Sequence, residues 1–114
     1  MFFNRKKKME KFVQLLQEML IEVEKAKSYI GSMHFVDAFG RTESNEPYIL
    51  GLKHVELEMK ELLKYAQNGV VYFKYGKKQR QLESSYWLRD NSFQIGRTSL
   101  GIGIAKVQNI YNKL

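Results

Sequence analysis

Residues that could do acid–base or metal chemistry are few in this chain of 114 residues. It has two histidines and no cysteine. The lack of cysteine excludes disulfides, zinc–thiolate sites and thiol nucleophiles. His34 lies three residues before Asp37, and His54 lies four residues before Glu58, so either pair could supply two metal ligands. Neither pair has a third ligand at a recognisable spacing, so we predict no metal site and interpret His54 and Glu58 as a solvated surface pair.

Glycine-rich segments give no better case for nucleotide chemistry. Gly96 to Gly101 has the glycine spacing of a phosphate loop, but Ile102 stands where a lysine is required. Gly101 and Gly103 match only part of a dinucleotide fingerprint, and no clear strand precedes them. The sequence also lacks a Gly-x-Ser-x-Gly elbow. We interpret these glycines as packing at the start of a helix, expect no cofactor and no small-molecule ligand, and predict that the protein is not an enzyme.

The best candidate for function is a stretch in which aromatic residues are interleaved with basic ones. Aromatic faces beside cations suit single-stranded nucleic acid, through base stacking and phosphate contacts. An aromatic core with a charged rim is a competing interpretation, because sheets are rich in aromatic residues. A surface that binds another protein is the third. The candidate partner-binding residues are Tyr72, Lys74, Tyr75, Lys77, Lys78, Arg80, Trp87, Arg89 and Arg97.

The net charge of +7 is distributed unevenly. Residues 1–8 carry +4, residues 9–73 carry −3, residues 74–97 carry +4 and residues 98–114 carry +2. Such asymmetry suggests an anionic partner on one side of the molecule. A charge of this size is also ordinary for the solubility of a small domain, so both interpretations stay open.

The elements that must position these residues begin with a long helix. Its apolar residues recur at alternating steps of three and four, which is a heptad seam kept for three heptads. We predict a helix from about Asn4, as N-cap, to Ile30, with Gly31 just after its end. Residues 1–8 form a basic tail that should fray, because its cations oppose the helix dipole. The seam consists of Met9, Phe12, Leu16, Met19, Val23, Ala26 and Ile30.

A second helix with a matching seam follows. It should begin near Glu46 or Pro47 and end at Asn68-Gly69. Two long helices with complementary seams predict an antiparallel hairpin. The connection between them has an apolar stretch at 33–39, which is either a flap that closes the core or a binding loop or edge strand. The second seam consists of Leu52, Val55, Met59, Leu62 and Ala66.

After Gly69 the pattern becomes strand-like. Residues 70–75 are β-branched and aromatic, and residues 82–88 alternate weakly, so we predict a β-hairpin. The competing interpretation is a third helix through Gln79 to Arg89. A final helix, capped by Thr98 or Ser99, should close the core with the stripe Leu100, Ile104, Val107, Tyr111 and Leu114.

Together these patterns predict one domain over residues 1–114. We expect an α+β, mainly helical fold with a long antiparallel helix pair, a small β-hairpin and a C-terminal helix; an all-α four-helix bundle is the alternative. No apolar run is long enough for a membrane span, and charge recurs soon after the basic start, so we expect a soluble, cytoplasmic protein.

The function that we expect is that of a small non-enzymatic accessory or regulatory protein. It would bind a macromolecular partner, another protein, through its basic C-terminal half. Single-stranded nucleic acid bound by the region 72–89 is the alternative, and a small-molecule enzyme is third. Because the seam of the first helix is broader than one partner helix needs, we also predict a homodimer.

Overall fold

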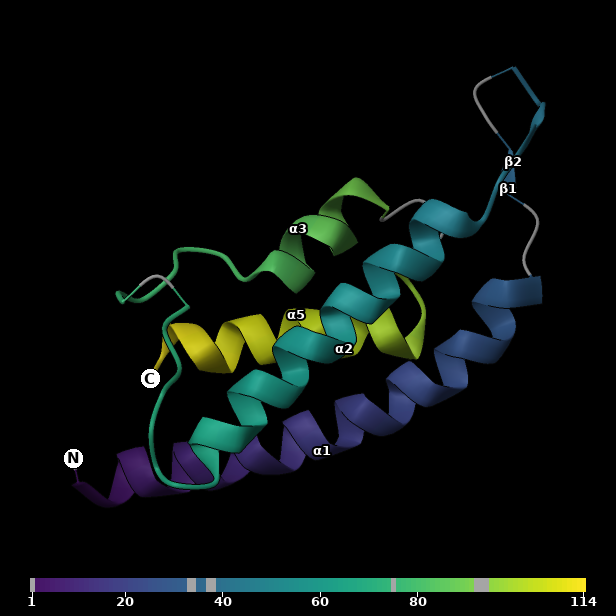
Figure 1. The fold of residues 1–114 in the computed structure, drawn as a ribbon. Helices are drawn as coiled ribbons and strands as arrows, with labels where there is room; N and C mark the ends of the chain where they lie inside the picture. Colours follow the sequence, from purple (N-terminus) through teal and green to yellow (C-terminus); the bar gives the residue numbers. More distant parts are fainter. Residues whose placement is uncertain (1, 33–34, 37–38, 75, 92–94) are drawn as a thin grey trace.

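The described part of the chain is mainly helical. The computed structural model describes residues 2–32, 35–36, 39–74, 76–91 and 95–114. Figure 1 shows the order of the elements, which are α1 (Phe2–Ser32), β1 (Phe35–Val36), β2 (Thr42–Glu43), α2 (Glu46–Ala66), α3 (Glu83–Asp90) and α5 (Ser99–Asn112). The two-residue strands β1 and β2 pair antiparallel within the connection between α1 and α2.

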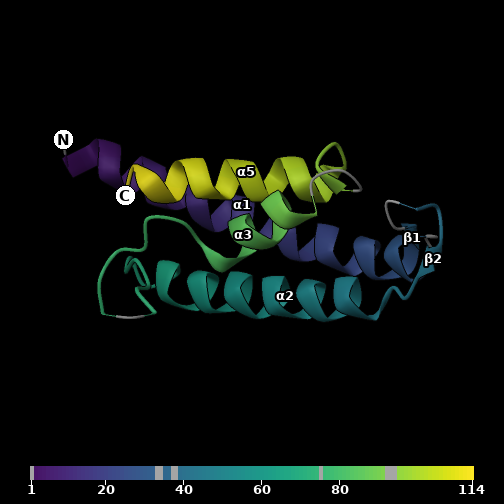
Figure 2. The same ribbon diagram turned by 90° about the horizontal axis from the view of Figure 1, so that it is seen from above.

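α1 is the longest helix, and the other long helices pack along it. Both α2 and α5 pack against it, and α3 packs against α2 and α5. Figures 1 and 2 show that α2 and α5 run antiparallel to α1, so the predicted helix pair is confirmed. The molecule is elongated, with a longest dimension of 53 Å. All the predicted seam residues of α1 and α2 are buried.

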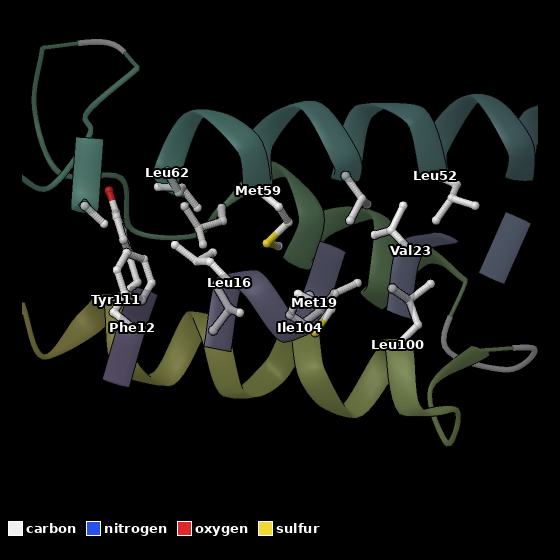
Figure 3. Close-up of a cluster of buried hydrophobic side chains, with 14 of the residues drawn as sticks. Phe12, Leu16, Met19, Val23, Leu52, Met59, Leu62, Leu100, Ile104 and Tyr111 are labelled. Carbon is white, nitrogen blue, oxygen red and sulfur yellow. The ribbon is translucent and has the colours of Figure 1, made fainter. Parts of the chain in front are cut away.

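The broad apolar stripe of α1 serves two helices of its own chain. Figure 3 shows Leu16 and Met19 lying between the side chains of α2 and those of α5. Phe12 meets Tyr111 of α5 with ring centroids 6.4 Å apart. Gly103 of α5 lies directly against the Met19 sulfur. The width of the stripe therefore gives no argument for a second copy, and the homodimer stays a prediction.

The predicted β-hairpin after Gly69 is wrong, and the all-α alternative fits. Residues 70–74 form no strand, and the segment predicted as the second strand, 82–88, lies almost entirely within α3. The apolar residues of the first segment pack on the helices instead of pairing with a strand. Val71 is buried in the core, and the Tyr72 ring stacks on that of Tyr65 at a centroid distance of 4.8 Å.

The helix ends predicted from the sequence agree closely with the structure for α2 and α5 and less closely for α1. Thr98 caps α5, because its hydroxyl oxygen accepts a hydrogen bond from the Gly101 backbone N–H at 3.2 Å. α2 has its bounds within two residues of the prediction. α1 begins at Phe2, two residues before the predicted cap Asn4, and ends at Ser32, two residues after the predicted last residue Ile30.

Candidate functional site

The segment 72–89, which carries most of the candidate residues, is attached to α2 by hydrogen bonds to one carboxylate. Glu58 accepts hydrogen bonds from the backbone N–H of Glu83 (2.9 Å) and from that of Ser84 (2.8 Å). It also accepts one from the Ser84 hydroxyl (2.6 Å). The first N–H groups of a helix have no partner within the helix, so Glu58 supplies the cap that α3 lacks locally. The predicted role of Glu58 as a solvated partner of His54 is therefore wrong: it is half-buried and holds α3.

A glutamine of α5 forms hydrogen bonds with the start of α3 from the other side. Gln108 accepts a hydrogen bond from the Leu82 N–H (2.8 Å) and from the Ser85 hydroxyl (2.7 Å). The loop before α3 is also tied to α5, because the Tyr111 hydroxyl accepts from the Gln79 N–H at 3.2 Å. Burial raises the pKa of Tyr111, so this hydroxyl stays protonated at neutral pH. The loop is thus held in one position relative to the ends of α2 and α5.

The two candidate stacking residues that the structure describes are both occupied by intramolecular packing. Tyr72 is half-buried under its stack with Tyr65. Trp87 is also half-buried, and its indole lies against Gly51 of α2. The indole N–H is buried and has no hydrogen-bond partner among the described residues. Tyr75 lies outside the described residues. One face of Tyr72 is therefore taken by Tyr65, and the Trp87 indole is taken up by its contact with Gly51.

The candidate cations do not form one surface. Lys74 forms an ion pair with Glu83 at 2.6 Å, close to the start of α3. The Arg89 guanidinium lies 5.0 Å from the centre of the Tyr86 ring and close to Asp90. Arg89 and Arg97 flank the end of α3 and the start of α5, away from the loop that carries Lys77, Lys78 and Arg80 (Figure 1).

The structure places the loop cations at the same end of the bundle as those at the start of α1, on different sides of that end (Figures 1 and 2). The first turns of α1, the loop after α2 and the last turn of α5 lie at the same end of the bundle (Figures 1 and 2). We call this the basic end. Its cations are all exposed, and they are Arg5, Lys6, Lys7, Lys8, Lys77, Lys78, Arg80 and Lys113.

One cation of the basic end, Lys78, has a structural role. The Lys78 ammonium donates a hydrogen bond to the Asn112 carbonyl at 2.8 Å, which satisfies an acceptor at the end of α5. It also lies 5.8 Å from the centre of the Tyr111 ring. Lys77 and Arg80 have no such contact among the described residues, so their charges can serve a partner.

An open groove of about 650 Å³ lies between α1 and the end of α2, beside Arg5 and Lys6. Its apolar lining comes from Met9 and Val13 of α1 and from Ala66 of α2. Gly69, just after α2, adds backbone without a side chain. Its polar lining residues are Arg5, Lys6, Glu10 and Gln67.

A smaller pocket of about 240 Å³ beside His54 is a weaker candidate. Glu58 lines it, but its two oxygens are engaged by α3, as described above. Elsewhere in the described ranges, too, no three His, Asp or Glu residues are grouped so that they could hold a metal ion. His34 and Asp37, the other candidate pair, lie outside the described residues. The basic end and its groove are therefore the candidate site.

Comparison of the chain with protein-family models, with curated proteins and with solved structures finds no match in any of the three. Among the described residues, no helix has both the length and the apolar character needed to cross a membrane. The functional argument therefore depends on the basic end itself.

Proposed function

We propose that this protein is a non-enzymatic adaptor that binds an acidic segment of another protein at its basic end. One observation supports this proposal most: cations from α1, from the loop after α2 and from the end of α5 are gathered at one end of the bundle. Clustered cations attract an acidic partner and orient it. The start of α1 adds to this preference, because it has no acidic residue in its first turn and its dipole favours an anion.

A protein partner is favoured over single-stranded nucleic acid mainly by the apolar groove, because the aromatic residues are divided: Tyr72 and Trp87 are packed within the protein, whereas Phe73 and Tyr86 are 38% and 43% exposed. Binding of single strands without sequence preference combines phosphate contacts with stacking on aromatic faces. Tyr72 and Trp87 are packed against Tyr65 and Gly51, as described above. An apolar groove next to the cations also suits side chains of a protein better than it suits a phosphate backbone.

The proposal is tested by fluorescence anisotropy with two labelled probes, a glutamate-rich peptide and a single-stranded oligonucleotide, over a range of salt concentrations. The informative variant is Lys77→Ala/Arg80→Ala, which leaves the structural contact of Lys78 intact. The matched control is Arg89→Ala/Arg97→Ala, which removes the same charge from the other part of the molecule. We expect the first variant to bind the peptide about five- to tenfold more weakly and the control to change it less than about twofold.

Two results would contradict the proposal. Equal weakening by both double variants would show that net charge, and not the basic end, attracts the peptide. Binding of the oligonucleotide at physiological salt would favour the nucleic-acid alternative. In that case the slope of log affinity against log salt should fall by about 0.7 for each phosphate contact that Lys77→Ala and Arg80→Ala remove.

A further inference from the structure

The groove at the basic end lies where α1 continues past its partner helices. α1 has 31 residues and α2 has 21, so α1 is longer by about 15 Å at 1.5 Å per residue. At the basic end, the first turn of α1 protrudes beyond the ends of α2 and α5 (Figures 1 and 2). The groove opens between the first turns of α1 and the end of α2; Met9 and Ala66 form its floor, at 8% and 2% exposed, and Val13 is its more exposed apolar wall.

The lining of the groove has the character of a helix-packing surface. Met9 and Val13 are one helical turn apart on α1, so their side chains form a short ridge. Opposite them Ala66 is small and Gly69 has no side chain, which leaves space for another element to approach. Methionine is flexible and adapts to the shape of a bound apolar side chain. Val13 is only partly buried by the helices of the chain itself.

The charges around the groove define the polar side of what it can hold. Arg5 and Lys6 line it directly, and Lys7 and Lys8 follow on the exposed sides of the same turns of α1. Glu10 is the one acidic residue in the lining. A ligand that fits must therefore carry apolar side chains on one face and acidic side chains beside them.

We infer that the groove holds an amphipathic, acidic helix of the partner protein. Its apolar residues, spaced at i, i+3, i+4 and i+7, pack against Val13 over the floor that Met9 and Ala66 form, and its carboxylates meet Arg5 and Lys6. This inference depends on the proposed function and specifies the partner segment. A helix is the form that fits, because it satisfies its own backbone hydrogen bonds and presents one apolar stripe to a groove between two helices.

The test uses two synthetic peptides of about 18 residues, long enough to form five helical turns. One has leucines at the helical spacing and glutamates at the other positions; the second has the same composition in scrambled order. Binding of both to the full chain is measured by fluorescence anisotropy. We expect the ordered peptide to bind at least about tenfold more tightly, because burial of one or two leucines separates the two probes.

Two substitutions on α1 locate the effect. Val13→Gln makes the groove polar without changing the net charge, and it should reduce the preference for the ordered peptide to less than about threefold. Ile21→Gln is the matched control, because Ile21 is 58% exposed on the same helix and does not line the groove. It should leave the preference unchanged. Circular dichroism of both variants checks that the helices are retained.

The possible failures are distinguishable. If both peptides bind equally and Lys77→Ala/Arg80→Ala weakens both, the helix inference is overturned and the proposed function stands. If neither peptide binds, both are overturned. If light scattering shows a dimer that Val13→Gln converts to a monomer, a second copy of the chain fills the groove, and the inference is again overturned.

Discussion

Gly51 and Trp87 show how one residue without a side chain positions α3 on α2. The Trp87 indole occupies the space that a Cβ atom at position 51 would need. α3 has only eight residues, so this contact and its caps account for much of its attachment. Sequence periodicity does not predict such a contact, because a glycine within a helical pattern indicates only a lower helix propensity.

We expect Gly51→Ala to lower the free energy of unfolding by about 1–3 kcal/mol, because the new methyl group displaces the Trp87 ring. Trp87 is the single tryptophan of the chain, so its fluorescence should shift to longer wavelength as the indole becomes more exposed. The control is Gly31→Ala, since nothing lies within 4 Å of a Cβ atom at that position of α1. Equal stability of the two variants would show that Trp87 does not pack on α2.

A second prediction at the residue scale concerns the ion pair between α1 and α2. Lys27 lies 2.7 Å from Glu56, and its hydrogen bond lowers the pKa of that carboxyl below the ordinary value. A lowered folded-state pKa contributes stability above the pKa of the unfolded chain, and this contribution is lost as the pH falls through the folded-state value. Glu56→Gln should therefore be less stable than the native chain at pH 7 and equally stable in acid.

Unfolding by urea at a series of pH values measures this difference. Glu61→Gln is the matched control, because Glu61 is exposed on the same helix and has no ion pair among the described residues. A stability difference for Glu56→Gln that persists unchanged into acid would refute the ion-pair explanation.

At the scale of elements, the attachment of α3 depends on Glu58. Replacement of Glu58 by alanine leaves the first N–H groups of α3 without acceptors, at a cost of about 1–3 kcal/mol. We also expect faster hydrogen exchange at the Glu83 and Ser84 amides, which donate to Glu58. Glu61→Ala, one turn away and exposed, should leave both quantities unchanged. Unchanged exchange in Glu58→Ala would show that α3 does not need this cap.

The main helix pair gives the largest expected effects. Leu16 and Leu62 are 0% and 1% exposed and point into the core shown in Figure 3. We expect Leu16→Ala and Leu62→Ala each to destabilise the protein by about 2–5 kcal/mol in denaturant unfolding. A loss below about 1 kcal/mol from both would mean that these seams are not the core.

Elements with a long apolar period could be predicted from the sequence, and the short ones could not. The seams of α1 and α2 repeat over several turns, so each predicted core residue is buried. The segment 82–88 is too short for its period to separate strand from helix. Its helical state is decided by Glu58 and Gln108, which lie at least 20 positions away in the sequence. That is why the hairpin prediction failed.

At the scale of the whole molecule, the basic end is a product of topology. In the sequence, residues 1–8 and residues 74–97 are separate basic segments, and the loop cations at 77–80 belong to the second. Residues 76–80 lie at the same end as the start of α1 because α2 runs back along α1, and the end of α5 lies there because α5 does the same (Figures 1 and 2). The sequence indicated the antiparallel course only for α2. The candidate site predicted from the sequence was continuous from Tyr72 to Arg97. In the structure, its arginines at 89 and 97 lie away from the loop cations, and Tyr72 and Trp87 are packed against α2 and its neighbours.

The central claim is that the two basic segments form one binding surface. It is tested most directly by the amide spectrum of the full isotope-labelled chain during titration with the ordered acidic peptide. We predict that the perturbed amides gather in residues 5–13, 66–69 and 76–80 and at Lys113, and that those of Arg89 and Arg97 do not change. Perturbations centred on residues 89–97, or shifts confined to only one of the two basic segments, would contradict the account.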